Sequence, residues 1–232
     1  MTSAENSIEK YSCDFCNKEF KRPNSLLNHI CQSKHRWLER TKPSSRIAFQ
    51  AWLHFYAKNT LTKKKREYID FIKSPYYTAF LKFGIYCVDV NVANVYAYMD
   101  YLIKNQIRID TWNTDTVYTK FLIEFLKEED PLDAIARSIE TTIELAKSDG
   151  VSSNDVLRYG NRNRICYTVT AGKISPWMLF HSESGAKLLD TLDETQIKMI
   201  IDYINPEKWA LKFRREPENV KIVKEILAAG GY

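Results

Sequence analysis

The chain has 232 residues, 44% hydrophobic and 27% charged, with a mean hydropathy of −0.40. This composition excludes a disordered chain and a membrane-spanning protein, and the length accommodates a small module joined to a larger domain. Residues 1–73 carry 15 Lys and Arg against 7 Asp and Glu, a net charge of +8, whereas residues 74–232 carry 19 against 22, a net charge of −3. The asymmetry predicts a basic nucleic-acid contact surface on a neutral or acidic body, with a solvated basic face as the alternative.

The first segment, residues 1–10, has neither the apolar core of a secretory signal peptide nor the Arg-rich, acid-poor face of a transit peptide. We therefore expect a flexible N-terminus on an intracellular protein. The five cysteines agree with this expectation, because an odd number without a secretion signal disfavours a disulfide framework.

The next stretch contains closely spaced cysteines and histidines. Two residues separate Cys13 from Cys16, and His29 and His35 complete the pattern C-x2-C-x12-H-x5-H. Two thiolates on a tight turn and two imidazoles about one helical turn apart suit the tetrahedral coordination of zinc. The spacing therefore predicts one structural Zn²⁺ held by these four residues.

Residues 11–35 resemble a C2H2 zinc finger in their ligand spacing and in the core positions Tyr11, Phe20 and Leu26. The resemblance covers only a small part of the chain, and the short linker that joins successive fingers in this family is absent after His35. It implies a ββα fold over residues 11–36 and contact with nucleic acid.

The helix of such a finger presents its first turns to the bases, and Pro23 suits its first position. Arg can bond a guanine through two hydrogen bonds, and Asn can do the same with an adenine. We predict contacts to nucleic acid, DNA rather than RNA, from Arg22, Asn24, Ser25 and Asn28. The alternative is a folded clip, whose helix packs on the rest of the protein or on another protein.

Cys31 lies between the two histidines and is an alternative zinc ligand. Residues three or four apart share a helix face, whereas Cys31 is two residues from His29. A regular helix would not direct both at one ion. His35 is therefore the preferred ligand, although its five-residue gap strains a regular helix.

Residues 37–73 are expected to form a basic, helical connecting segment. Its cations would release counterions from a polynucleotide and add salt-sensitive affinity. The predicted phosphate contacts are Arg36, Arg40, Lys63, Lys64, Lys65 and Arg66. The aromatic residues between them either stack on bases or, as helical spacing favours, form a core; we assign Trp52, Phe55 and Tyr56 to the core.

Residues 74–232 are expected to form a mostly helical C-terminal domain, because apolar residues recur there at three- and four-residue steps. Gly150 suits a helix C-cap, and Thr191 with Glu194 suits a capping box. Alternation over residues 164–170 predicts a strand, and the turn residues 171–173 after it predict a short β-hairpin. The predicted fold class is therefore mainly α: a small ββα zinc finger followed by a larger helical domain with a short β-hairpin.

Glycine-rich phosphate loops, nucleophile elbows and metalloprotease motifs are absent from the sequence. No catalytic residue is assigned, although a nuclease that gathers scattered carboxylates around a divalent ion is an alternative. The loop over residues 159–164, rich in Asn and Arg, is a secondary candidate for nucleic-acid contact, with an ordinary polar turn as its alternative.

Beyond the finger, the string from the basic cluster through FIKSPYYTAFLKFG to ISPWMLF resembles finger-bearing proteins of large tailed phages. The resemblance implies a nucleic-acid-processing setting in a host cytoplasm and no particular reaction. The sequence favours a zinc-dependent nucleic-acid-binding protein whose helical domain recruits a partner. The alternative is a protein-interaction module of replication or transcription machinery, with the finger as a structural clip.

Overall fold

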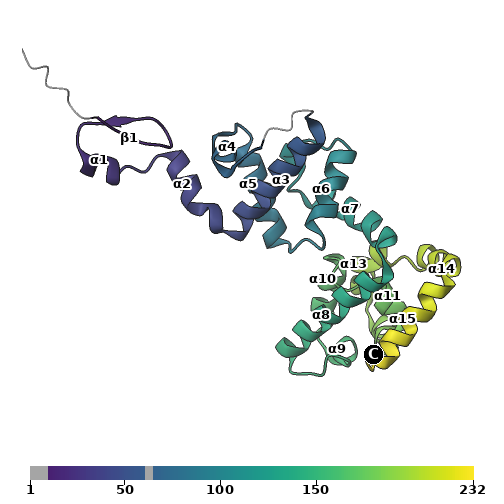
Figure 1. The fold of residues 1–232 in the computed structure, drawn as a ribbon. Helices are drawn as coiled ribbons and strands as arrows, with labels where there is room; N and C mark the ends of the chain where they lie inside the picture. Colours follow the sequence, from purple (N-terminus) through teal and green to yellow (C-terminus); the bar gives the residue numbers. More distant parts are fainter. Residues whose placement is uncertain (1–9, 61–64) are drawn as a thin grey trace, which may run out of the picture. The chain divides into compact units, whose positions relative to one another are not determined.

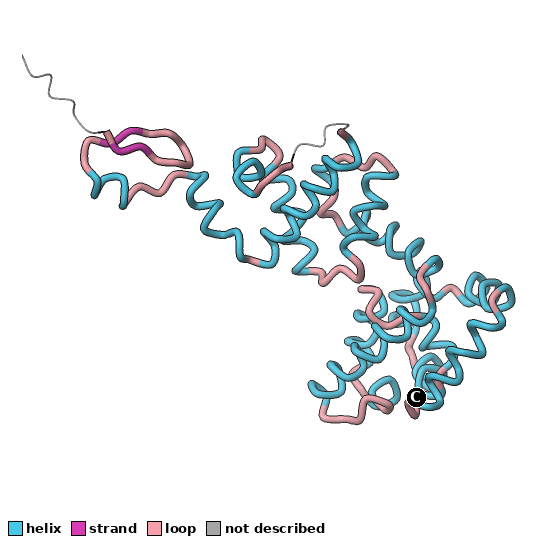
Figure 2. Tube along the Cα trace, viewed as in Figure 1, coloured by secondary structure: helices cyan, strands magenta, loops and turns pink. Residues whose placement is uncertain are grey.

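The computed structural model describes residues 10–60 and 65–232, which are mainly helical (Figure 2). The segment expected to be flexible, residues 1–10, lies outside the described residues apart from Lys10. Contacts within the chain divide it into two compact units. The first runs to Asp89 and includes Ile107–Asp110, and the second contains Val90–Gln106 and Thr111–Tyr232.

The first unit begins with a small antiparallel hairpin and a short helix (Figure 1). β1 (Tyr11–Ser12) pairs with β2 (Glu19–Phe20), and Tyr11 lies opposite Phe20. α1 (Pro23–Leu27) follows, with a proline in its first turn, where the missing N–H is not needed. The predicted ββα order is confirmed, in very short elements.

The remainder of the first unit is helical. Its elements are α2 (Gln32–Leu38), η1 (Glu39–Thr41), α3 (Pro43–Asn59), α4 (Tyr68–Lys73) and α5 (Tyr77–Asp89). α3 and α5 pack against each other, and their backbones approach closely at Gly84. A Cβ at this position would clash with the carbonyl oxygen of Ser44, so the approach requires glycine.

An aromatic core lies between these helices. Trp52 is buried, as predicted, and its ring contacts Phe71 at a centroid distance of 5.5 Å. Tyr56 and Phe55 are half-buried; the ring of Tyr56 contacts Trp52 at 5.1 Å, and that of Phe55 contacts Phe80 at 5.8 Å. Tilted and edge-on ring pairs of this kind add to the free energy gained from burial alone.

The second unit is built from helices. They are α6 (Val95–Lys104), α7 (Asp115–Glu128), α8 (Pro131–Asp149), α9 (Val156–Tyr159), α10 (Arg162–Thr170), α11 (Pro176–His181), α12 (Glu183–Thr191), α13 (Glu194–Ile204), α14 (Pro206–Arg215) and α15 (Pro217–Ala229). A 3-10 helix, η2 (Ile109–Thr111), precedes α7; its first two residues belong to the first unit and Thr111 to the second. None of the described helices is both long enough and apolar enough to cross a membrane.

Local capping explains where several of these helices begin and end. Gly150 ends α8 in the left-handed conformation, with φ of 68°, which confirms the predicted C-cap. The capping box before α13 is formed by Asp193 and Gln196, two residues after the predicted pair. The Asp193 carboxylate accepts a hydrogen bond from the Gln196 N–H at 2.9 Å, whereas Thr191 is the last residue of α12.

The predicted β-hairpin over residues 164–170 is wrong, because this stretch is the helix α10. The side chain of Asn161 accepts a hydrogen bond from the Arg164 N–H at 3.1 Å and so caps the helix. Ile165 and Val169, four residues apart, are both buried, and α10 packs against α13. Tertiary packing of this apolar face outweighs the strand preference of β-branched residues.

Candidate metal centre

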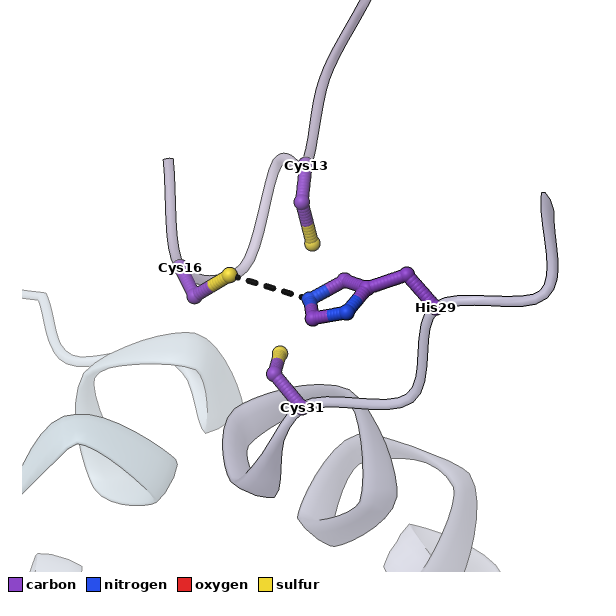
Figure 3. A group of neighbouring side chains, drawn as sticks. All are labelled: Cys13, Cys16, His29 and Cys31. Carbon is purple, nitrogen blue, oxygen red and sulfur yellow. Dashed lines mark hydrogen bonds between the residues drawn. The ribbon is translucent and has the colours of Figure 1, made fainter. Parts of the chain in front are cut away.

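Four side chains converge on one point at the amino-terminal hairpin (Figure 3). Cys13, Cys16, His29 and Cys31 each offer one ligand atom, and these atoms lie within 4.8 Å of one another. The Cys16 Sγ and the His29 Nε2 are 3.2 Å apart. Zn–S bonds of about 2.3 Å and Zn–N bonds of about 2.0 Å place tetrahedral ligand atoms roughly 3.5 Å apart, so the donor set fits one zinc ion. Over residues 10–60 and 65–232, no other group of three Cys, His or acidic side chains is arranged in this way.

The first two cysteines are presented by the turn between β1 and β2. The Cys13 N–H donates to the Lys18 carbonyl oxygen at 3.0 Å, and the Asn17 N–H donates to the Cys13 carbonyl oxygen at 2.8 Å. Asn17 adopts a left-handed φ of 57°, which Asn tolerates better than most residues. These bonds close a tight knuckle in which Cys13 is buried and Cys16 is exposed.

The other two ligands come from the break between α1 and α2. Cys31 is the N-cap residue of α2, and its Sγ accepts a hydrogen bond from the Lys34 N–H at 3.4 Å. The Lys34 ammonium donates to the carbonyl oxygen of His29 at 3.0 Å. Extended backbone at Cys31, with φ of −89° and ψ of 166°, lets two residues so close in sequence face the same point.

The structure brings Cys31, rather than His35, to the fourth position. His35 lies within α2; its side chain is 62% exposed, and its Nδ1 is 3.8 Å from the Glu39 carboxylate. The assumption of one regular helix through both histidines is wrong, because α1 ends at the C-cap residue Asn28. His29 therefore lies in irregular backbone, where the helical spacing argument does not apply. Asn28 has a right-handed φ of −82°, not the left-handed conformation for which Asn is favoured after a helix, so no local signal in the sequence marks this break.

Burial, backbone hydrogen bonds and the neighbouring sulfur atoms together shift the pKa values of the two knuckle thiols in opposite directions. Burial opposes ionisation of Cys13, but hydrogen bonds from the backbone of Phe15 and Cys16 bring its pKa below the ordinary thiol value. The pKa of Cys16 is raised, because a hydrogen bond from the backbone of Lys18, which lowers it, is outweighed by partial desolvation and by the neighbouring Cys13 and Cys31 thiols. A thiolate at Cys13 thus disfavours a second one at Cys16, and a bound cation would allow both to ionise.

The residues predicted to contact bases lie at α1. Arg22 is its N-cap residue, Asn24 and Ser25 are in its first turn, and Asn28 is its C-cap residue. All four are exposed. Because α1 has only five residues, it presents a shorter polar face than the predicted helix through both histidines would. Contact of these residues with bases stays a prediction.

Two of the predicted phosphate contacts take part in the fold. The Arg36 Nη1 donates to the carbonyl oxygen of Ile72 at 2.6 Å, and its guanidinium lies 4.1 Å from the ring centroid of Tyr77. The Arg40 Nη1 donates to the carbonyl oxygen of Trp37 at 3.1 Å. Sequence reasoning missed this role of Arg36, because its partners follow more than thirty residues later.

The basic cluster is described only in part. Lys63 and Lys64 lie outside the described residues. Lys65 is 89% exposed, with its ammonium 3.9 Å from the Glu67 carboxylate. The Arg66 guanidinium lies 4.6 Å from the ring centroid of Tyr56, so its stem is held against α3.

The secondary candidate, residues 159–164, is a loop only at Gly160 and Asn161, because Tyr159 ends α9 and Arg162 begins α10. One of its arginines takes part in an ion pair. The Arg164 Nη1 donates to the Asp149 carboxylate at 2.6 Å and to the Ser148 hydroxyl at 2.7 Å. The Asn161 N–H also donates to Asp149, at 3.2 Å. These contacts join the start of α10 and its N-cap residue to the end of α8.

Comparisons of the chain with protein-family models, with curated proteins and with solved structures found no match. No relative therefore supports the resemblance to phage proteins. The class of site follows from the residues themselves. A cysteine and histidine cluster beside a short hairpin and helix is compatible with a zinc finger, and it constitutes a candidate zinc-binding site.

Proposed function

We propose that Cys13, Cys16, His29 and Cys31 hold one structural Zn²⁺ and that the finger folded around it binds nucleic acid, DNA in particular. The observation that carries this proposal is the convergence of four ligand atoms within 4.8 Å. Four protein ligands leave no open coordination position for water, so the ion has a structural role rather than a catalytic one.

The small size of the finger supports a need for metal. Its strands have two residues each, and α1 has five. From Lys10 to Cys31, Cys13 is the only buried residue. A segment that buries so little apolar surface requires another source of folding free energy, and zinc binding supplies it in small finger modules.

The charge around the site supports a polyanionic partner. Residues 1–73 carry a net charge of +8. Lys21 and Arg22 precede α1 and are exposed, as are Asn24 and Asn28. Cations of this kind position a phosphate backbone, and the two amides offer paired donors and acceptors to base edges.

The metal half of the proposal is tested with a matched pair of variants. The full chain, Cys31→Ser and His35→Ala are purified, and zinc is measured by mass spectrometry of the metal. Cys31→Ser is expected to lose most of its bound zinc, whereas His35→Ala keeps one ion per chain. Full zinc content in Cys31→Ser, or loss in His35→Ala, contradicts the ligand set.

The nucleic-acid half is tested by fluorescence anisotropy with labelled DNA, as duplex and as single strand. Arg22→Ala and Asn24→Ala are expected to weaken binding by about 1–3 kcal/mol each while zinc content is retained. Binding should also weaken steeply as salt rises. Unchanged affinity in both variants, or salt-independent binding, contradicts this half of the proposal.

A second candidate function is a protein-interaction module in which the finger is a structural clip. It is favoured by a chain of ring contacts, since Phe15 contacts Trp37 and Trp37 contacts Tyr68 of α4. The finger thus packs on helices of its own unit. A folded, zinc-loaded protein that binds no DNA at low salt would support this function over the first.

A further inference from the structure

A concave, cation-rich site lies on the second unit, lined by residues of α7 and α14 and by Glu216, the C-cap residue of α14. Its volume is about 300 Å³, and the lining cations are Lys127 from α7 and Lys208, Lys212 and Arg215 from α14. This volume is at the lower end of the range for small-molecule sites. It is sufficient for a phosphate group with part of the moiety attached to it.

The sequence of α14 explains the cationic face. Lys208, Lys212 and Arg215 follow one another at steps of four and three residues, so they share one side of the helix. Trp209 is buried on another side and anchors the helix. The aromatic ring of Trp177 lies 5.7 Å from the Lys212 ammonium.

Within the part of the chain that the structure describes, most of these cations have no acidic partner. Lys212 is the exception, because its ammonium pairs with the Glu216 carboxylate at 2.7 Å. For Lys127, Lys208 and Arg215, no carboxylate among the described residues lies within 4.0 Å. Like charges gathered around one hollow repel one another, and an anion bound between them removes this repulsion.

The positive charge of the hollow contrasts with the negative net charge of residues 74–232. Residues 74–232 carry a net charge of −3, yet the hollow gathers four cations against two acids. One of these acids, Glu216, is already neutralised by Lys212. The other, Glu128, is exposed at the lining and opposes an incoming anion. Leu211, 51% exposed, adds an apolar wall.

We propose that this hollow binds a phosphate group, with Lys127, Lys208 and Arg215 pairing with its oxygens and Leu211 contacting the attached sugar or base. Ammonium and guanidinium groups are the usual protein partners of phosphate. The phosphate belongs either to a nucleic-acid backbone or to a free nucleotide, which share this chemistry. The site lies outside the unit that contains the finger and does not depend on zinc.

The test is calorimetric titration of the full chain with inorganic phosphate, with ATP and with a short oligothymidylate, at constant ionic strength. The variant Lys127→Gln/Lys208→Gln/Arg215→Gln is expected to bind at least about tenfold more weakly to whichever probe binds the wild type. The matched control changes three exposed lysines of the second unit that do not line the hollow. They are Lys104, Lys147 and Lys221, each replaced by Gln. This control loses the same charge and is expected to stay within about twofold of the wild type.

A second variant keeps the proposal testable if the triple substitution impairs folding. Glu128→Gln removes the opposing carboxylate and is expected to tighten phosphate binding by about two- to fivefold. A response of ATP identifies a free nucleotide as the ligand, and a response of the oligonucleotide alone identifies the backbone.

The finger variant Cys16→Ser separates this proposal from the zinc-dependent one, because its phosphate binding should persist when its zinc is lost. Absence of saturable binding of every probe overturns the phosphate site. Equal losses in the triple variant and its control overturn it as well.

Discussion

Phe15, which lies between the two cysteines of the knuckle, packs against Trp37 of α2 with ring centroids 5.9 Å apart. Trp37 also contacts Tyr68 of α4 at 5.9 Å, in an edge-on arrangement. Because the knuckle holds Phe15 in place, the geometry of the candidate zinc site and the packing of α2 and α4 are linked. The finger and the helices that follow it are therefore expected to respond together when the metal is removed.

Metal removal should be visible at Trp37. We expect a strong chelator to open the knuckle, withdraw Phe15 from the indole and shift the fluorescence of Trp37 to longer wavelength as water reaches the ring. The measurement is the chelator-induced difference spectrum of the wild type against that of Trp37→Phe. If both proteins give the same difference spectrum, the link between the metal site and α2 does not exist.

Arg36 should contribute to stability. Arg36→Ala removes a hydrogen bond of a charged donor to the Ile72 carbonyl oxygen and a guanidinium above the Tyr77 ring. We expect a loss of about 1.5–3 kcal/mol in the free energy of unfolding by urea. Arg46→Ala, at an exposed position of α3, is the matched control and should change stability by less than about 0.5 kcal/mol. Equal stability of the two variants would show that Arg36 is free for other partners.

The ion pair of Glu129 with Arg137 should contribute to the stability of the second unit. Their side chains are 7% and 15% exposed, both guanidinium Nη atoms donate to the carboxylate, and the Arg137 Nε donates to the Gly172 carbonyl oxygen at 2.8 Å. Glu129→Ala leaves a buried guanidinium without its counterion, which costs about 3–5 kcal/mol.

The control for this pair is Glu194→Ala. Glu194 pairs with Lys198 on the surface of α13, and both side chains are more than 70% exposed. Its removal should cost at most about 0.5 kcal/mol. Urea unfolding of both variants provides the comparison, and a similar cost in the two would refute the special role of the buried pair.

The second unit should become less stable as the pH falls, because His181 is held neutral in the folded protein. Burial, and then the positive charge of Lys224, lower the pKa of His181 from 6.5 to about 4. Its ring packs on Phe213 at a centroid distance of 4.4 Å, and its Nε2 has no hydrogen-bond partner among the described residues. Between these two pKa values the unfolded chain binds more protons than the folded one.

The contribution of His181 is therefore complete above pH 6.5 and is lost as the pH falls from 6.5 towards 4. His181→Phe keeps an aromatic ring in this place and removes the titration. Its free energy of unfolding, measured across this pH range, should fall less steeply than that of the wild type. Parallel curves for the two proteins would mean that His181 titrates alike in the folded and unfolded chains.

Much of the fold follows from signals that act over a few residues. Proline at the first turn of α1, glycine at the end of α8 and three- and four-residue apolar steps predict helices, and these helices are present. The stretch over residues 164–170 shows the limit of local signals. Its β-branched residues favour a strand, but capping by Asn161 and packing on α13 make it helical.

Sequence alone determined three members of the candidate metal site, Cys13, Cys16 and His29, because a two-residue knuckle and the first histidine after it are placed by short-range geometry. Tertiary structure decided the fourth. Cys31 joins them only because the chain leaves the helical path at Asn28 and starts a new helix, and spacing rules assume that path is continuous. The contacts of Arg36 also join segments that are far apart in the chain, as do the cations of α7 and α14 that line the hollow. The packing of buried side chains brings these segments together, and no local sequence pattern encodes it.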